Sequence, residues 1–379
     1  MSSLSIGIVG LPNVGKSTLF NALLKQQAAL AANYPFATIE PNVGVVPVPD
    51  ARLTELARVI AESEKLQSPP PIKPATIEFV DIAGLVKGAS QGEGLGNKFL
   101  AHIRETAMVA HVVRAFEDGD IIREGSTDPL SDLETIRTEL QLADLATLSK
   151  QPQPKGVVDK EAQQRWDILQ EFTAIINEGK PIHTSPRLQK TVSGDPDELA
   201  MLVAKELCLL TAKAELFVVN VSEDQLTEST YSDLVEKFAA QLKVSQEAVI
   251  VVSAKIESEL SSLAEEDQTL YLADLGMESS GLERLIQRAY QVLGLQSFLT
   301  AGDVEVRAWT VKSGTSAPQA AGVIHTDFAK KFIKAIVCDY TDFISLGGLK
   351  AARDQGKIRQ EGKEYIMRPD DVVEFMIGK

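Results

Sequence analysis

The chain has 379 residues, enough for two or three domains, and 44% of them are hydrophobic, as in ordinary globular proteins. The chain has 53 acidic and 38 basic side chains, and the resulting net charge of −15 disfavours indiscriminate wrapping of DNA or RNA. Two cysteines exclude a disulfide framework and a four-cysteine zinc site. No apolar run approaches the roughly 20 residues that span a bilayer, so we expect a cytoplasmic protein without membrane contact.

The first candidate site lies near the N-terminus. An apolar run at residues 4–9 leads into GLPNVGKST at residues 10–18, and a helical pattern follows at residues 19–25. This string matches the phosphate loop G-x-x-x-x-G-K-[ST], in which backbone N–H groups and a helix N-terminus surround phosphates. Lys16 would reach the outer phosphates, and Ser17 would bind Mg²⁺. The predicted nucleotide-binding residues here are Asn13, Val14, Gly15, Lys16, Ser17 and Thr18.

Further apolar, β-rich runs at residues 76–80, 108–115, 214–221 and 248–252 alternate with helical segments, which predicts an α/β core with a covered parallel sheet. The run at 76–80 ends in Asp81-Ile82-Ala83-Gly84. An acid there can hold a magnesium water, and a glycine N–H can sense a γ-phosphate. We therefore expect Asp81 near the metal, through water, and Gly84 at the phosphate.

Two later strand ends predict a base pocket. Val-Asn-Val-Ser-Glu at 219–223 lies where GTPases carry N-K-x-D, and Val-Ser-Ala-Lys at 252–255 lies where they carry S-A-K. Val221 replaces the lysine and the longer Glu223 replaces the aspartate, so the two-hydrogen-bond recognition of guanine is not expected and adenine becomes acceptable. The predicted base-pocket residues are Asn220, Val221, Glu223, Ser253, Ala254 and Lys255.

Two segments differ from this core. Residues 129–211 have helical spacing interrupted at 151–156, which favours an inserted helical hairpin over helices that simply cover the sheet. Residues 302–379 predict a small α+β module, with short strands at 304–311, 334–337, 365–368 and 372–376 around a helix at 327–334. The core then comprises residues 1–128 and 212–300.

These motifs together resemble the YchF, or Obg-like ATPase, family. The resemblance covers essentially the whole chain and includes NYPFATIEPN at 33–42, DIAGLVKGA at 81–89, GEGLGN at 92–97, VRAWT at 306–310 and IHTDF at 324–328. It implies a Ras-like P-loop core of the Obg group, an antiparallel helical (coiled-coil) insert at 129–211 and a C-terminal TGS domain of ubiquitin-like fold. It also implies ATP preferred over GTP and association with ribosomes.

The resemblance places Thr38 at the switch I threonine, which would close on Mg²⁺ and the γ-phosphate together with Lys16 and Gly84. Ras-type enzymes carry a water-orienting glutamine where this chain has Leu85. Family members often have a histidine where this chain has Arg123, which is either a transition-state cation or a solvated residue. Asn13 has the spacing of asparagines that hold K⁺ in some GTPases, although asparagine also suits a left-handed turn.

The sequence thus predicts a Mg²⁺-dependent nucleoside triphosphatase that hydrolyses ATP to ADP and phosphate and acts as a switch on the ribosome, its large subunit or the whole particle. The alternatives are a GTP-specific regulator of the Obg type and a nucleotide sensor whose hydrolysis is incidental. A basic group would contact ribosomal RNA phosphates, or would simply be a solvated face. It consists of three lysines expected on one helix and four later cations: Lys330, Lys331, Lys334, Lys350, Arg353, Lys357 and Arg359.

Overall fold

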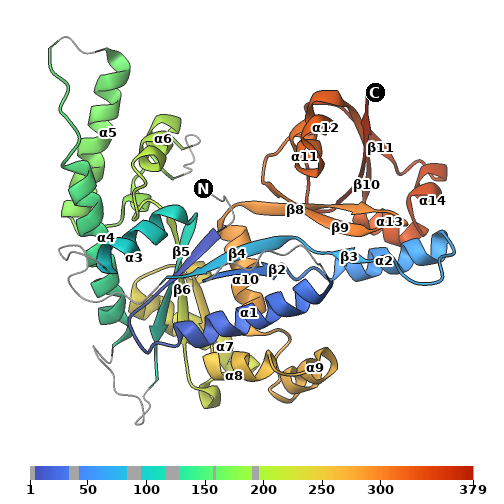
Figure 1. Ribbon diagram of the computed structural model, residues 1–379, viewed down its shortest axis with the longest axis horizontal. Coiled ribbons are helices and arrows are strands. Elements are labelled where there is room, and N and C mark those ends of the chain that lie inside the picture. The colour runs from blue at the N-terminus through green and yellow to red at the C-terminus, as the bar shows by residue number, and fades with distance from the viewer. Residues whose placement is uncertain are drawn as a thin grey trace. The chain divides into compact units, whose positions relative to one another are not determined.

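The computed structural model describes residues 5–33, 42–82, 95–116, 128–156, 159–189 and 196–378. The chain divides into two compact units (Figure 1). The first comprises residues 1–44 and 78–285, and the second comprises residues 45–77 and 286–379.

The first unit is built on a sheet with strand order β2-β4-β1-β5-β6-β7. β1 is parallel to β4 and β5, and β5, β6 and β7 are parallel in turn. Every residue of β5 is buried, as expected for a strand covered on both faces. The α/β prediction is confirmed. The strands are β1 (Ser5–Val9), β2 (Val43–Pro47), β4 (Thr76–Asp81), β5 (Met108–Arg114), β6 (Ala214–Asn220) and β7 (Val249–Val252).

Helices cover this sheet through two apolar clusters. In one, Val113 and Phe217 pack against Phe238 of α7. In the other, Val109 packs against Ile103 of α3 and Ile136 of α4. The helices are α1 (Lys16–Asn33), α3 (Leu95–Glu105), α4 (Pro129–Leu148), α7 (Glu228–Leu242), α8 (Ala254–Leu260), α9 (Glu265–Asp274) and α10 (Gly281–Val292), of which α10 crosses from the first unit into the second.

Residues 129–211 combine the two arrangements that the sequence left open. α4 begins with the Asp128 carboxylate accepting the N–H of Ser131 at 3.2 Å, and its first half packs on the sheet. Its last residue, Leu148, packs instead with Phe172 of α5 (Lys160–Asn177) and Val203 of α6 (Glu198–Glu206). Figure 1 shows α5 lying away from the strands. One helix therefore covers the sheet and also carries a projecting helical subdomain.

A buried charged cluster ties α4 to the sheet. The Glu215 carboxylate bonds His111 Nε2 at 3.0 Å and Arg137 at 2.8 Å, and His111 stacks on Phe217. Burial alone would raise the pKa of Glu215, but the His111 hydrogen bond and the charges of His111 and Arg137 lower it to about 2. The cluster therefore joins β5, β6 and α4 by charged hydrogen bonds as well as by apolar packing.

The second unit contains a mixed sheet with strand order β11-β10-β12-β8-β9-β3. β8 and β9 are antiparallel, as are β10 and β12, and the short β3 is parallel to β9. α2 packs on β8 and β9 and buries Leu53, Leu56, Val59 and Ile60. The strands are β3 (Ile72–Lys73), β8 (Leu295–Ala301), β9 (Val306–Lys312), β10 (Phe332–Asp339), β11 (Arg359–Glu361) and β12 (Asp371–Ile377). The helices are α2 (Arg52–Ser63), α11 (Ala317–Ile324), α12 (Thr326–Lys331), α13 (Tyr340–Leu346) and α14 (Leu349–Asp354).

This unit departs from its sequence prediction in three respects. It includes β8 and the distant segment 45–77, whereas we expected a module that begins at residue 302. The predicted helix at 327–334 ends at Lys331, so Lys334 lies on β10 and not with Lys330 on a helix. Residues 365–368 form a single bridge, between Ile366 and Ser316, and no strand. Here the N–H of Arg368 bonds the Asp371 carboxylate and is unavailable to a strand partner.

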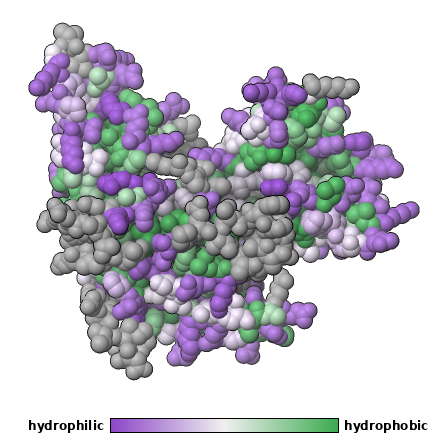
Figure 2. Space-filling model, viewed as in Figure 1, coloured by the Kyte–Doolittle hydropathy of each residue, from purple (hydrophilic) through white to green (hydrophobic). Residues whose placement is uncertain are grey.

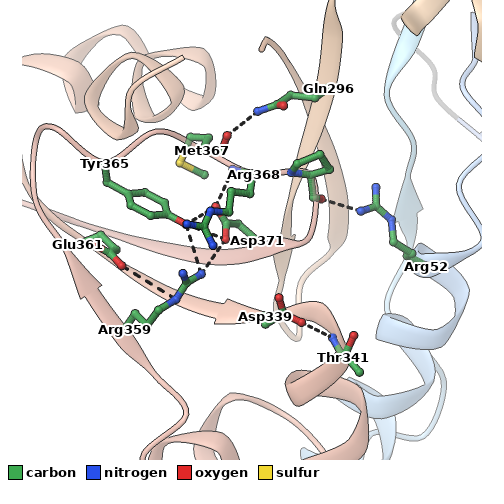
Figure 3. Close-up of polar contacts among 11 residues, drawn as sticks. Arg52, Gln296, Asp339, Thr341, Arg359, Glu361, Tyr365, Met367, Arg368 and Asp371 are labelled. Carbon is green, nitrogen blue, oxygen red and sulfur yellow. Dashed lines mark hydrogen bonds and ion pairs between the residues drawn. The ribbon is translucent and has the colours of Figure 1, made fainter. Parts of the chain in front are cut away.

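Figure 3 shows the polar cluster that accounts for this loop. Asp371 is 1% exposed, and its carboxylate accepts hydrogen bonds from Arg359 at 3.0 Å and from the Tyr365 hydroxyl at 2.9 Å. Arg52 donates to the Pro369 carbonyl at 2.6 Å. These contacts fix the chain before β12 and attach the 45–77 segment to the C-terminal strands.

On the face shown in Figure 2, hydrophilic residues cover most of the described surface and hydrophobic residues appear in separate groups between them. Among the helices of the described ranges, none is both long enough and apolar enough to cross a membrane. The exposed apolar side chains include Leu270, Val304 and Ile333. Leu270 lies on α9, Val304 lies in the loop between β8 and β9, and Ile333 lies on β10.

Candidate functional site

The phosphate loop connects β1 to α1 at the carboxyl edge of the first sheet. Asn13 and Gly15 have φ angles of 62° and 98°, in the left-handed region. A Cβ atom at Gly10 would lie 2.6 Å from the Val112 carbonyl oxygen, so only glycine fits there. These conformations produce the tight turn that the motif predicts.

Lys16 lies at the start of α1 and is 7% exposed. Its ammonium donates to the Leu11 carbonyl at 2.8 Å. Burial lowers the pKa of Lys16, and the negative charge of Asp81 opposes that shift. Burial likewise raises the pKa of Asp81, and the Lys16 charge opposes it. The structure thus brings Lys16 and Asp81 into electrostatic contact at the loop, as the two motifs predict.

Asn220 joins three loops of the site. Its Nδ2 donates to the Val14 carbonyl at 3.0 Å, and its Oδ1 accepts the N–H of Ala254 at 2.9 Å. A Cβ atom at Gly15 would overlap the Asn220 amide, so the second loop glycine is also required by packing. Because both hydrogen bonds are buried, Asn220 holds the phosphate loop and the α8 N-terminus in one register.

A pocket of about 390 Å³ lies beside these loops. Its wall contains all six predicted base-pocket residues and three of the six predicted phosphate-loop residues, Asn13, Gly15 and Thr18. Val14 and Lys16 are buried and Ser17 is exposed, and these three do not line the pocket. The complete wall consists of Asn13, Gly15, Thr18, Arg114, Phe116, Asn220, Val221, Ser222, Glu223, Asp224, Ser253, Ala254, Lys255 and Ser258.

Two of the predicted base-pocket residues lie at one end of this pocket, which we call the base end. Val221 is 1% exposed, and its apolar side chain brings no hydrogen-bonding group to the wall. The Glu223 carboxylate pairs with the Lys255 ammonium at 2.7 Å. Ser253 is buried, and its hydroxyl has no hydrogen-bond partner among the residues that the structure describes.

Sequence reasoning missed Arg114 and Phe116 in this wall. Arg114 is 2% exposed, donates to the carbonyls of Phe116 at 3.1 Å and Asn13 at 3.4 Å, and lies over the Phe116 ring at 4.4 Å. The available signal was a polar residue that directly follows two apolar residues at a strand end, since Asp81 and Asn220 occupy the same kind of position. Arg114 connects the phosphate loop to the chain that follows β5.

Three predicted catalytic residues lie outside the described residues: Thr38, Gly84 and Arg123. Their roles stay predictions. In the described ranges, no group of three or more histidine, cysteine or acidic side chains has a metal-binding arrangement. Among the described residues, the candidate oxygen ligands are the Ser17 hydroxyl and, through water, the Asp81 carboxylate, and Thr38 stays the third predicted ligand.

Comparison with known proteins gives matches along the whole chain. A family profile described as "50S ribosome-binding GTPase" matches residues 5–148, and the YchF-GTPase_C profile, described as a protein of unknown function, matches residues 295–378. The chain is 49% identical to "Ribosome-binding ATPase YchF" of Haemophilus influenzae over 376 residues, covering 97% of this chain and 98% of that protein. It is 45% identical to the protein of the same name in Bacillus subtilis over 378 residues, covering 98% and 99% of the two chains.

A solved structure is also similar. The "Schizosaccharomyces pombe YchF GTPase" superposes with a TM-score of 0.83 at 36% sequence identity, and the match covers 99% of this chain and 98% of that one. The similarity therefore extends over both units and the projecting helices.

Proposed function

The chain belongs to the YchF, or Obg-like ATPase, family and is a P-loop nucleoside triphosphatase, and on that premise we propose that it hydrolyses ATP to ADP and phosphate as a Mg²⁺-dependent switch that binds the ribosome. The observation that carries the ATP assignment is the base pocket. There, a buried valine replaces a lysine, and the acid that would read guanine pairs with Lys255. GTP is expected to bind more weakly.

A GTP-specific regulator is the main alternative, because the relatives' names include both an ATPase and a GTPase. Equilibrium titration of the purified protein with ATP and GTP separates the two. We expect a lower dissociation constant for ATP. A dissociation constant for GTP that is tenfold lower than that for ATP would overturn the assignment.

The residues present fit Mg²⁺. Ser17 is exposed at the first turn of α1, and Asp81 ends the neighbouring β4 and interacts electrostatically with Lys16, so both hard oxygen donors belong to the loops at the carboxyl edge of the sheet. The lack of a larger acidic cluster among the described residues suits a cation that takes most ligands from phosphate and water. When bound, Mg²⁺ neutralises charge on the β- and γ-phosphates. Ser17→Ala should raise the Mg²⁺ concentration needed for half-maximal turnover, and an unchanged titration would contradict its role as ligand.

Within the chain, the phosphate-loop N–H groups and Lys16 would orient the triphosphate and stabilise charge on the γ-phosphate. Thr38 and Gly84 would close on that phosphate. Leu85 has no hydrogen-bonding group, so the attacking water needs another positioning contact and the basal rate should be low.

Without a switch II glutamine, the transition state needs a further positive charge. Asn13 is our first candidate to supply this charge, by holding K⁺ at the phosphates, and Arg123 is the second. Asn13 lines the pocket in a left-handed conformation, which a turn alone would also explain. Turnover in KCl and NaCl at equal ionic strength distinguishes the two roles. We expect faster turnover in KCl for native protein and no salt preference in Asn13→Ala. Equal native rates would remove K⁺ and leave Arg123 or a partner residue.

The names of the relatives support the proposal that the protein binds the ribosome, and the basic residues of the second unit are the candidate contact. Lys330 and Lys331 lie on α12, and Lys350 and Arg353 lie on α14. Arg359 is bonded to Asp371 and Lys357 pairs with Asp342 at 3.3 Å, so these two are less available. We place the protein in the cytoplasm, bound to the large subunit or the whole ribosome and not to DNA or a membrane.

Co-sedimentation with ribosomes in ATP, ADP and a non-hydrolysable analogue tests this partner. We expect nucleotide-dependent pelleting and faster ATP turnover in the presence of ribosomes. Pelleting without any effect on turnover would favour the alternative of a passive nucleotide sensor.

A further inference from the structure

A side-chain ion pair borders the base end of the pocket. Glu223 begins the short turn after β6, and Lys255 is the second residue of α8. Their charged atoms lie 2.7 Å apart, and both side chains line the pocket while remaining partly exposed, at 40% and 63%. The hydrogen bond to Glu223 raises the pKa of Lys255, so the Lys255 ammonium keeps its charge at neutral pH.

The two purine bases make opposite demands on this position. Guanine presents two donors on its Watson–Crick edge, and a free carboxylate can accept both. Adenine presents one donor and one acceptor, and a carboxylate repels that acceptor. A carboxylate that is already bonded and neutralised by an ammonium is a poorer acceptor for guanine.

We propose that Lys255 is a specificity-determining residue, which lowers the affinity for GTP relative to ATP by pairing with Glu223 and keeping its carboxylate from the base. This inference rests on the proposed ATP preference and adds a residue that enforces it. Glu223 alone, though one methylene longer than aspartate, would still be a carboxylate at the pocket wall.

The Ser253 hydroxyl indicates that a polar ligand group binds at the same wall. Ser253 is 1% exposed, lines the same pocket two residues before Lys255, and has no partner among the described residues. A buried hydroxyl without a partner is costly unless a ligand satisfies it. A hydroxyl both donates and accepts, so it can bond either purine, and the choice between them is left to the carboxylate and its pairing with Lys255.

The size of the effect follows from exposure. Exposed ion pairs contribute little, so releasing Glu223 should change base preference by only roughly threefold to fivefold. Lys255 also contributes its aliphatic stem to the wall, but that contact is similar for either purine. The ratio of the GTP to the ATP dissociation constants therefore isolates the ion pair.

The test is equilibrium binding of ATP and GTP to full-length native protein and four variants: Lys255→Ala, Lys255→Arg, Glu223→Gln and the double change Lys255→Ala with Glu223→Gln. We expect the GTP:ATP ratio to fall about threefold to fivefold in Lys255→Ala. It should remain near the native value in Lys255→Arg, which keeps the pair. In the presence of Glu223→Gln, the further change Lys255→Ala should leave the ratio unaltered. An unchanged ratio in Lys255→Ala would overturn the proposal.

Ionic strength gives a second measurement, which is made on the native protein and needs only Glu223→Gln as its control. Salt screens an exposed pair, so the native GTP:ATP ratio should fall between 50 and 500 mM KCl, whereas that of Glu223→Gln should not. The triphosphates are identical and their own salt dependence cancels in the ratio. A native ratio independent of salt would count against the pair.

These outcomes separate this inference from the proposed function. Native protein that prefers ATP, with a ratio insensitive to Lys255→Ala and to salt, removes only the role of Lys255. Native protein that prefers GTP removes both the ATP assignment and the inference that depends on it.

Discussion

The phosphate end and the base end of the pocket are held by different kinds of group. At the proposed phosphate end the wall contains backbone in left-handed conformations, and the buried Lys16 lies next to it in the chain. At the proposed base end, selection would depend on side chains, and the charged pair there is partly exposed. Geometry fixed by backbone accepts almost no substitution, whereas geometry fixed by exposed side chains can change preference without loss of the fold. Mutations at the phosphate end should therefore have large effects on turnover, and mutations at the base end should change the preference between ATP and GTP by smaller steps.

The largest effect is expected at the phosphate end. Lys16→Ala removes the buried cation that faces Asp81, and turnover should fall by roughly 10²–10³-fold. Single-turnover hydrolysis measures this. Lys16→Arg is the matched control, since it keeps the charge but not the compact ammonium, and it should also be slow. Turnover of Lys16→Ala within tenfold of native would contradict the assigned role.

Asn220 connects the two ends, so its loss should affect both bases equally. Asn220→Ala leaves the Val14 carbonyl and the Ala254 N–H without their buried partner, at a cost of about 1–3 kcal/mol each. We expect a lower free energy of unfolding by urea and weaker binding of ATP and GTP alike. Asn220→Asp keeps the acceptor for Ala254 and should lose less. A change in the GTP:ATP ratio would show that Asn220 reads the base.

Helix α8, which begins at the predicted base pocket, also contains a buried acidic residue. Glu257 is 2% exposed and accepts the N–H of Gly281 at 2.8 Å at the start of α10. Burial raises its pKa to about 7, against 4.5 in the unfolded chain. The folded state therefore holds the proton more tightly, and this group reduces stability as pH rises from 4.5 to 7.

Glu257→Gln removes that charge while keeping an acceptor oxygen. It should raise the free energy of unfolding by about 2 kcal/mol at pH 8 and change it little at pH 5, as measured by urea unfolding at both values. An equal effect at the two values would mean that Glu257 does not titrate in this range.

A stepwise effect is expected on the preference between ATP and GTP. Changing Val221 to Lys and Glu223 to Asp together restores the residue types of a guanine pocket. Preference should shift toward GTP by tenfold or more, about 1.4 kcal/mol. Competition binding measures the shift, with each single change as control. If the double variant binds ATP and GTP in the native ratio, these two positions do not set base choice.

The same contrast explains what could be predicted from sequence. The phosphate loop, Asp81 and Asn220 were predictable because chain-local motifs encode backbone geometry at strand ends. The pair of Glu223 with Lys255 was not, because nothing local specifies which rotamers two exposed side chains 32 residues apart adopt. Arg114 could not be predicted because a polar residue at the end of a strand is equally typical of a strand end that is exposed to solvent.

The fold shows a similar division. The parallel sheet was predictable from long apolar runs, whereas β3 has two residues and no detectable period. Its partner β9 begins more than 230 residues later, so the membership of 45–77 in the second unit had no local signal. Lys334 was placed on a helix because helical and strand spacing coincide over a few residues.

The discontinuity of the second unit has a consequence for synthesis of the chain. α2 leaves the ribosome about 240 residues before β9, the strand that covers its buried leucines. At a synthesis rate of roughly 5–20 residues per second, β9 is made on the order of 10–50 s after Leu53 and Leu56, and the two side chains lack their packing partner during that time. The strands of the first unit are all synthesised before β9, since β7 precedes β9 in the chain. The newly made protein thus passes through a stage in which the nucleotide pocket is complete and the apolar face of α2 is still open to chaperones.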